Sequence, residues 1–551
     1  MKGGIRPLEN FQGREFDLIV IGAGINGAGI ARDAAMRGLS VLLLDKGDIS
    51  SGTTSWSTRL IHGGLRYLEY YEISLVRESV KERARLLHIA PHLVRALSFL
   101  IPIYKGARYG RAKIEAGMLA YKLLSLGYEL GEHRLLSSRE ALTMEPGLNP
   151  HGLIGAALYF DAQVEYPERL TLETAISARQ HGAIVLTYCR VDRILVEASS
   201  VRGVEFTDLL NGTRHQARAA VTINVTGPWV DEVLRTTGQP VKQLVGATKG
   251  SHLIVEPFPN APRQALYVEA GRDGRPYFIV PWTGLYLIGT TDLPYDGDRD
   301  QVTPLEEEIE YLVQETNRTL PGANLSAEKI AYCYSGLRPL PYVLSGSPKD
   351  ITRRHFIHDH APELSGLYSV VGGKITTYRN LGEQAVDAVL RKLGRRTTRS
   401  TTAARPLPGA YGEDVAREAL ALGTRYNLGD GIVARLLRIY GGRAINLLKL
   451  CDEDPRWRQE ISPGVGAIGA EVVFALRTEV ARTLADVLLR RTMVGMRPDL
   501  GVGADQAATE IAVQSLGWSR DKAQHEVTEY RRYIERFRLE QVETIGQGSR
   551  A

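Results

Sequence analysis

FDLIVIGAGINGAGIARDAAMRGLSVLLLD, from Phe16 to Asp45, is the stretch that decides the fold. It contains two apolar runs that predict buried strands, and a helix-forming segment between them that Gly38 is placed to end. The first run leads into a G-x-G-x-x-G turn made by three glycines: Gly22, Gly24 and Gly27. This order of strand, glycine-rich turn, helix and strand predicts one complete βαβ unit of a dinucleotide-binding fold.

Each glycine of this turn has a separate physical task. Gly22 permits the tight turn, Gly24 lets the backbone approach a pyrophosphate, and Gly27 lets the helix pack close to the strand. The helix N-terminus then presents free N–H groups and its positive dipole end to the phosphates. Asp45 ends the second strand at the distance expected for an acid that accepts hydrogen bonds from the adenosine ribose. An acid there repels a 2′-phosphate, which disfavours NADP and leaves NAD and FAD as the choice.

Length and composition narrow the class of protein. A chain of 551 residues with 44% hydrophobic and 24% charged residues is an ordinary globular protein with room for about two or three domains. The three cysteines are scattered, which argues against a disulfide framework or a metal site and indicates a reducing cytosol. We expect no secretory signal and no membrane span, because no apolar stretch is long enough. The net charge of +5 gives no reason to expect a nucleic-acid partner.

Segments outside the first βαβ unit also suit a nucleotide. Hydroxyl groups and glycines crowd residues 50–64, directly after the expected ribose-binding strand, and such a loop suits phosphate and flavin contacts. The alternative is a loop that only caps the following helix. The segments NVTG and VVGGKITTYR each end an expected strand on small residues, which permits close approach to a cofactor. The candidate cofactor-binding residues are thus Gly22, Gly24, Gly27, Asp45, Thr54, Ser55, Ser57, His62, Gly64, Thr226, Gly227, Gly373 and Thr376.

One block of this loop resembles a known family. GTTSWSTRLIHGGLRYLE, at 52–69, is similar to the signature of FAD-dependent glycerol-3-phosphate dehydrogenases of the aerobic, quinone-linked type, as is the N-terminal DLIVIGAGINGAGIARDAA. Further blocks continue the resemblance in the same order at 224–231, 249–255, 281–292, 334–340, 351–353, 371–379 and 407–409. The resemblance implies FAD as the cofactor and is weaker in the helical tail.

The resemblance also implies where a phosphorylated substrate binds. A phosphate dianion is best held by guanidinium and ammonium groups in a partly dehydrated pocket. The cations in the matching blocks are Arg66, Arg338, Arg353 and Lys374, and Tyr67 adds a hydroxyl. Oxidation of a secondary alcohol also requires a group that takes the hydroxyl proton. His252, in the KGSH block, is the candidate base because its ordinary pKa lies near neutrality, with Arg338 and Lys374 as rival hydroxyl-contacting groups.

The resemblance implies FAD-dependent oxidation of sn-glycerol 3-phosphate to dihydroxyacetone phosphate, with electrons passed to a quinone. The rivals are an oxidase that uses oxygen on the same substrate, and an amino-acid or amine oxidase of the wider superfamily. The cation cluster favours the phosphate, since an amino-acid site needs only one carboxylate-binding arginine. From another class, a non-catalytic nucleotide-binding or assembly protein remains an alternative. A homodimer is one candidate assembly.

The expected architecture is α/β, with a doubly wound FAD-binding domain interleaved with an antiparallel-sheet substrate domain over residues 1–400. We expect the substrate parts at about 90–150 and 243–360, a hairpin turning at Asn211 and Gly212, and an all-helical domain at 401–551 whose last residues, 546–551, are disordered. Five helical stretches indicate that domain, among them one continuous helix through AEVVFALRTEVARTLADVLLRR at 470–491.

A basic amphipathic helix is expected at 104–126. Its apolar stripe consists of Ile114, Met118, Tyr121, Leu124 and Leu126. Such a helix either packs this stripe into the core or lies in the lipid headgroup layer with its cations toward anionic lipid. Because a quinone dissolves in the bilayer, the expected reaction favours a cytoplasmic enzyme that lies peripherally on the inner face of the membrane.

Overall fold

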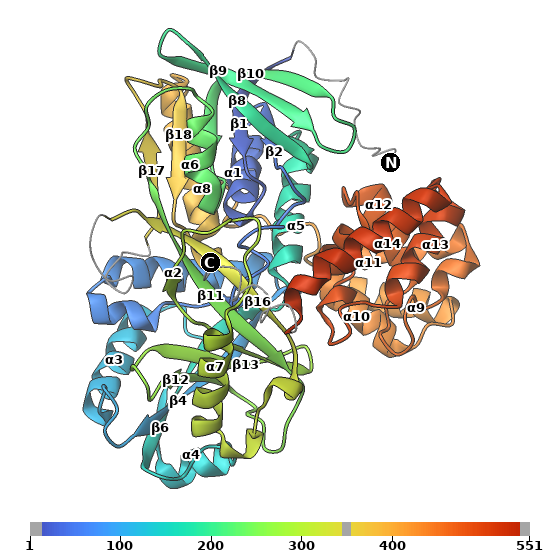
Figure 1. Ribbon diagram of the computed structural model, residues 1–551. Coiled ribbons are helices and arrows are strands. Elements are labelled where there is room, and N and C mark those ends of the chain that lie inside the picture. Colours follow the sequence, from blue (N-terminus) through green and yellow to red (C-terminus); the bar gives the residue numbers. More distant parts are fainter. Residues whose placement is uncertain (1–13, 344–353, 540–551) are drawn as a thin grey trace, which may run out of the picture.

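The computed structural model describes residues 14–343 and 354–539 and is built from two sheets and a helical C-terminal region (Figure 1). In Figure 1 the sheet that contains β1 lies at the top and the second sheet at the bottom, and the helical region, coloured orange to red, lies at the right. Among the described residues, no helix is long and apolar enough to cross a bilayer.

The first sheet has the predicted nucleotide-binding topology. Its strands follow the order β17–β18–β10–β1–β2–β7, and the five from β18 to β7 are parallel. The bounds of its strands are β1 (Glu15–Ile21), β2 (Val41–Leu44), β7 (Ile184–Leu186), β8 (Cys189–Glu197), β9 (Ser200–Asp208), β10 (Arg214–Asn224), β17 (Phe356–Asp359) and β18 (Leu367–Val371). The strand pair β9–β10 turns at Asn211 and Gly212, as predicted.

Two different layers cover this sheet. On one face an apolar core joins the strands to three helices, α1 (Ile25–Met36), α5 (Pro167–Gln180) and α8 (Tyr378–Lys392). On the other face the alternate strand residues pack against the β8–β9 hairpin and α6 (Val230–Arg235). The predicted βαβ unit is present, because α1 lies between β1 and β2 and ends at Met36, two residues before Gly38, whose φ is 82°. The predicted α/β FAD-binding fold is confirmed.

The second sheet is mostly antiparallel and follows the order β15–β11–β14–β13–β12–β4–β6–β3, with β16 beside β11 and β5 beside β6. Its strands are β3 (Leu60–Ile61), β4 (Val94–Tyr104), β5 (Arg134–Ser137), β6 (Leu153–Val164), β11 (Val245–Val255), β12 (Ala265–Glu269), β13 (Pro276–Trp282), β14 (Leu285–Gly289), β15 (Leu293–Pro294) and β16 (Ile330–Pro341). Helices α4 (Ser138–Met144) and α7 (Glu306–Thr319) pack into one of its cores, and α2 (Ile73–Ile89) and α3 (Arg111–Leu124) into another.

Two strands belong to a different sheet from the one their position in the chain indicates. We expected the strands up to Asp359 to lie in the substrate sheet, but β17 pairs antiparallel with β18 in the first sheet. Conversely, β6 starts beyond the expected substrate segment and pairs along its length with β4 in the second sheet. Strand patterns in a sequence indicate which face is buried but not which distant strand is the neighbour, and that pairing decides the sheet.

Between residues 400 and 539, all the secondary-structure elements that the structure describes are helices. The longer helices are α9 (Glu413–Arg425), α10 (Asp430–Tyr440), α11 (Ala444–Lys449), α12 (Gly469–Thr478), α13 (Ala504–Leu516) and α14 (Arg520–Ile534). The prediction of one continuous helix at 470–491 is wrong. Helix α12 ends before Val480, whose φ of 62° is left-handed, and the chain resumes as a π-helical turn, η10 (Asp486–Arg491). The residues at 546–551, expected to be disordered, lie outside the described residues.

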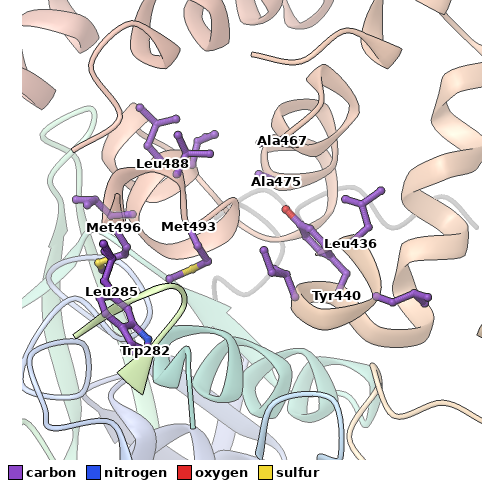
Figure 2. Packing of buried hydrophobic residues seen from close by; sticks show 14 of the residues in the cluster. Trp282, Leu285, Leu436, Tyr440, Ala467, Ala475, Leu488, Met493 and Met496 are labelled. Atoms are coloured by element: carbon purple, nitrogen blue, oxygen red, sulfur yellow. The ribbon is translucent and has the colours of Figure 1, made fainter. Parts of the chain in front are cut away.

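A shared apolar core joins the helical region to the second sheet. Trp282 and Leu285, where β13 turns into β14, lie beside Met493 and Met496 from the segment after η10 (Figure 2). The Trp282 side chain is 1% exposed, and its indole Nε1 donates to the Glu165 carbonyl at 2.8 Å. The helical region is therefore packed onto the body of the protein rather than tethered by a linker.

The predicted amphipathic helix at 104–126 is present in part, because β4 continues to Tyr104 and α3 starts only at Arg111. Its expected apolar stripe faces mainly inward. Met118 and Tyr121 are buried, and the Tyr121 hydroxyl donates to the Asp161 carboxylate at 3.0 Å. The expected stripe is therefore mostly inward-facing, except for Leu126, which is exposed, and the leucines that α3 itself exposes are Leu119 and Leu123.

Candidate active site

A cavity of about 2100 Å³ runs between the glycine-rich turn, the second sheet and the helical region. Most of the predicted site residues line it, although they come from segments far apart in the chain. Those that line it are Gly22, Gly24, Asp45, Thr54, Ser57, His62, Tyr67, Thr226, Gly227, His252, Arg338, Gly373, Lys374 and Thr376. The cavity is therefore where the structure brings the predicted cofactor-binding and substrate-binding residues together.

Five predicted residues do not line the cavity or cannot be placed there. Gly27 lies in α1 behind the turn, Gly64 packs against the Tyr67 ring, and Ser55 is buried with its hydroxyl donating to the Ser50 carbonyl at 2.6 Å. Arg353 and the side chain of Arg66 lie outside the described residues. The three that are described support the cavity wall from behind.

The nucleotide end of the cavity is formed by the turn from β1 to α1. Gly22 has a φ of 109°, and a Cβ atom there would lie 2.8 Å from the Val225 carbonyl oxygen. A Cβ atom on Gly24 would meet only the Thr54 hydroxyl, at 3.5 Å, so this glycine opens onto the cavity. The backbone is therefore bare where the α1 N-terminus faces the cavity, as a pyrophosphate requires.

The carboxylate of Asp45 fixes the loop at this end. Its Oδ2 accepts from the Ala23 N–H at 2.6 Å and its Oδ1 accepts from the Gly47 N–H at 2.8 Å. Burial raises the pKa of Asp45, and these two N–H groups oppose that shift. Each carboxylate oxygen has a further lone pair, so Asp45 can still accept from a ribose hydroxyl.

Several polar atoms at the cavity have no hydrogen-bond partner among the described residues. They are the Asn26 Oδ1, the Trp229 Nε1 and the Lys374 Nζ, all buried. Buried polar groups are normally satisfied, so such atoms along one cavity indicate a polar ligand. Together with the bare backbone at Gly24, they fit FAD, which carries a diphosphate, hydroxyl groups and a flavin ring.

Two loops far apart in the chain, which contain His62 and Thr376, lie side by side at the cavity. The His62 N–H donates to the Thr376 hydroxyl at 3.2 Å, which joins the Gly-Gly loop after β3 to the turn after β18. Lys374 lies in this turn with its Nζ 3.5 Å from the centre of the Tyr67 ring. Burial lowers the pKa of Lys374, and the neighbouring Tyr67 opposes the shift.

His252 and Arg338 project from adjacent strands of the second sheet. The His252 Nε2 is hydrogen-bonded to the Thr58 hydroxyl at 2.9 Å, and its ring stacks on Tyr334 with centroids 4.9 Å apart. Burial, followed by the positive charges of Arg338 and Arg59, holds the pKa of His252 well below its usual 6.5. The imidazole is therefore neutral at pH 7 and able to accept a proton.

The guanidinium of Arg338 is oriented by the loop after β14. Its Nη1 donates to the Asp292 Oδ1 at 3.1 Å, and its Nη2 donates to the Thr290 hydroxyl at 2.8 Å. A Cβ atom on Gly250, in the neighbouring strand, would lie 2.2 Å from the Nη2. The absence of a side chain at Gly250 is thus what gives the guanidinium its place in the cavity wall.

Sequence reasoning missed these supporting residues. Thr58 bonds His252, Asp292 and Thr290 orient Arg338, and a Cβ atom on Gly289 would lie 2.5 Å from the His252 ring. The glycines left a signal, because Gly250 lies two residues before His252 in KGSH and Gly289 directly precedes the threonines in IGTTD. Thr58 left none, since 194 residues separate it from His252.

Comparisons with known proteins agree with this geometry. A family model for FAD-dependent oxidoreductases matches residues 17–379, and a model for the C-terminal domain of alpha-glycerophosphate oxidase matches residues 400–523. The fold and the site thus define an FAD-dependent oxidoreductase. Among the part of the chain that the structure describes, no cluster of side chains is arranged to hold a metal ion.

Relatives narrow this class. The chain is 44% identical to a glycerol-3-phosphate dehydrogenase of Synechocystis over 96% of its own length and 98% of the relative's. It is 32% identical to an aerobic glycerol-3-phosphate dehydrogenase of Staphylococcus haemolyticus over 88% of each chain. The structure of the Bacillus halodurans glycerol-3-phosphate dehydrogenase complexed with FAD matches 96% of each chain at 29% identity, with a TM-score of 0.79. The chain belongs to the FAD-dependent glycerol-3-phosphate dehydrogenase family.

A larger residue at Gly24 is expected to exclude FAD from the folded protein. Gly24→Val places two methyl groups where the backbone faces the cavity, so the purified variant should carry less than about a tenth of the wild-type flavin absorbance. Gly431→Val is the matched control, since this glycine lies in α10 with nothing within 4 Å. Full FAD content in Gly24→Val would overturn the assignment of the pyrophosphate site.

Proposed function

We propose that the enzyme oxidises sn-glycerol 3-phosphate to dihydroxyacetone phosphate and passes the electrons to a quinone. The observation that carries the proposal is the pairing of two oriented cations, Arg338 and Lys374, with a neutral imidazole, His252, in the cavity that also contains the dinucleotide turn. The bound FAD supplies the hydride acceptor. The named relatives act on glycerol 3-phosphate, which supports the same substrate here.

Arg338 and Lys374 suit a phosphate dianion. The Arg338 guanidinium is held at Nη1 by Asp292 and at Nη2 by Thr290, so its positive charge is fixed in the cavity wall, where it would attract a phosphate. The buried ammonium of Lys374 has no acceptor among the described residues, so an anion in the cavity would satisfy it. The resemblance adds Arg66 and Arg353 to the phosphate site, with Tyr67 as a hydroxyl donor. This many cations favour a phosphate over the single carboxylate of an amino-acid substrate.

His252 is the proposed base for the hydroxyl proton. Its Nε2 is hydrogen-bonded to Thr58, which orients the ring, and its Nδ1 has no partner among the described residues. The low pKa keeps the ring unprotonated at neutral pH but weakens it as a base. The nearby charge of Arg338 would favour the alkoxide form of the substrate and so compensate for that weakness.

An oxidase that uses oxygen on the same substrate is the second candidate. The match of residues 400–523 to a domain named for alpha-glycerophosphate oxidase is the observation in its favour. The aerobic dehydrogenase of Staphylococcus haemolyticus supports the dehydrogenase reading, because the similarity to it extends over 88% of the chain. A quinone acceptor would also give a reason for a membrane-facing surface.

The helices α2 and α3 present such a surface. The Arg77 Nη1 donates to the Leu124 carbonyl at 2.7 Å and so ties the start of α2 to the end of α3. The exposed apolar side chains of this corner are Tyr71, Ile73, Leu119, Leu123 and Leu126, and Tyr71 is 87% exposed. The exposed cations Lys113 and Lys122 lie on the same helix as Leu119 and Leu123. We therefore place the enzyme on the cytoplasmic face of the membrane, held by this corner, which we call the α2–α3 patch.

The pH profile should identify the base. Because the pKa of His252 is lowered, kcat/KM should stay level as the pH falls to 6.5 and decline only below it. His252→Gln should lower kcat by about 10² to 10⁴-fold and remove that acid limb. Lys374→Met should keep this decline of kcat/KM at low pH and should raise KM for the substrate. An acid limb that persists in His252→Gln and vanishes in Lys374→Met would assign the base to Lys374.

Removal of the Arg338 guanidinium should lower kcat/KM more for glycerol 3-phosphate than for glycerol. Loss of a charged hydrogen bond of roughly 1.5–3 kcal/mol lowers kcat/KM for glycerol 3-phosphate by about ten- to a hundred-fold in Arg338→Ala. The loss should be smaller for glycerol, which has no phosphate, and Arg338→Lys should recover only part of the activity. Equal losses on both substrates would rule out a phosphate contact.

The α2–α3 patch should decide membrane binding. Leu119→Ser with Leu123→Ser removes two exposed apolar side chains, each worth about 1.5–3 kcal/mol when buried, and should release the enzyme from anionic liposomes at low salt. Lys113→Glu with Lys122→Glu should weaken binding in a salt-dependent way. Leu420→Ser, at an exposed leucine on α9, is the matched control and should bind like the wild type. Wild-type enzyme that never cosediments with the liposomes would refute membrane attachment.

A further inference from the structure

A buried charge cluster joins the ribose-side loop of the cavity to the C-terminal helical region. Asp48 lies three residues after Asp45 and is 1% exposed. Its Oδ2 accepts from the Arg490 Nε at 2.7 Å and from the Arg491 Nη1 at 2.7 Å, and its Oδ1 accepts from the Arg491 Nη2 at 2.8 Å. One carboxylate thus holds two adjacent arginines that lie more than 440 residues further along the chain.

The cluster is closed by a second acid. The Arg490 Nη2 donates to the Asp486 Oδ1 at 2.6 Å, and the Tyr188 hydroxyl donates to the same oxygen at 2.7 Å. Two carboxylates therefore face two guanidinium groups, and the charges balance. We call Asp48, Asp486, Arg490 and Arg491 the Asp48 cluster. Its arginines come from the π-helical turn η10, a rare geometry that occurs mostly at functional sites.

The loop that carries Asp48 is also fastened on its other sides. The Ser50 N–H donates to the Ala23 carbonyl at 3.1 Å, within the glycine-rich turn, and the Tyr188 N–H donates to the Gly47 carbonyl at 3.0 Å. Gly47, Asp48, Tyr188 and Arg490 all line the cavity. The wall beside the predicted ribose position is therefore made by the first sheet and the helical region together.

We propose that Arg490 and Arg491 are positioning residues for FAD, which fix the loop of residues 46–51 against the adenosine half of the cofactor through Asp48. Asp45 belongs to the same short segment, and its Oδ1 receives the Gly47 N–H, so a shift of Asp48 would move the acid expected at the ribose. The helical region is then part of the cofactor site, and FAD retention depends on it.

A second buried pair offers a control of the same chemistry. The Arg169 Nη1 and Nη2 donate to the two Glu479 carboxylate oxygens at 2.7 and 2.8 Å, which also joins the body of the protein to the helical region. None of the cavity-lining residues belongs to this pair. Arg443 pairs with both Glu479 and Glu173, so removal of the Arg169–Glu479 pair leaves no unpaired arginine.

The experiment compares two charge-neutral double variants of the full-length holoenzyme. In Asp48→Asn with Arg491→Gln, Arg490 keeps Asp486 as its partner. In Arg169→Gln with Glu479→Gln, a buried ion pair that does not line the cavity is lost, together with the Arg169 Nη1 contact to the Arg491 carbonyl at 3.5 Å, while the side-chain contacts between Asp48 and Arg491 stay. FAD release is followed by the rise in flavin fluorescence on dilution, and ADP binding to the apoprotein is measured by calorimetry, with thermal unfolding recorded for both variants.

We expect the Asp48 double variant to release FAD at least about tenfold faster and to bind ADP more weakly, whereas the Arg169 double variant stays within about twofold of the wild type in both. Equal release from the two variants, or wild-type release from the Asp48 variant, would show that the cluster only supports the fold. If the Asp48 double variant does not fold, Arg491→Lys, which keeps the charge and loses the two-pronged contact, takes its place. It should raise FAD release less than tenfold but above the wild type, and unchanged release would overturn the proposal.

Discussion

In the turn from β1 to α1, a Cβ atom on Gly27 would lie 1.8 Å from the carbonyl oxygen of Gly22. A Cβ atom on Gly22 would in turn lie 2.8 Å from the Val225 carbonyl oxygen at the end of β10. Only glycine permits this double approach, which brings two parallel strands and a helix N-terminus to one point. The position of the cofactor cavity, and of every group that faces it, depends on that contact.

The substrate end is formed by the second sheet, whose cross-strand glycines leave room for large polar side chains. Gly289 stands opposite His252, and Gly250 gives space to Arg338. The first sheet contributes Lys374, whose ammonium is buried in the cavity wall. A buried cation without an acceptor is costly unless an anion accompanies it, so the energetics of these groups favour a phosphorylated substrate.

Local signals predicted the parts of the fold that depend on neighbouring residues. The strand, glycine turn and helix that begin at β1 and the β9–β10 hairpin followed from periodicity and glycine spacing. The matching blocks added predicted site residues, most of which line the cavity. The sheet that β17 joins could not be predicted. The residue pattern of a strand shows which of its faces is buried but does not show that its neighbour is β18. The partners of Asp48 could not be predicted either. Arg490 and Arg491 are two adjacent basic residues, and such pairs of arginines usually lie on a protein surface. For α3, the stripe was recognised but its direction depended on Asp161, far along the chain.

Anaerobic addition of sn-glycerol 3-phosphate to the purified holoenzyme, followed by reoxidation, tests both the substrate and the electron acceptor. We expect that the substrate bleaches the flavin absorbance, that glycerol does so far more slowly, and that a quinone analogue restores the colour faster than oxygen does. A flavin that glycerol 3-phosphate leaves oxidised would contradict the proposed substrate. Faster reoxidation by oxygen than by the quinone would assign the enzyme as an oxidase instead.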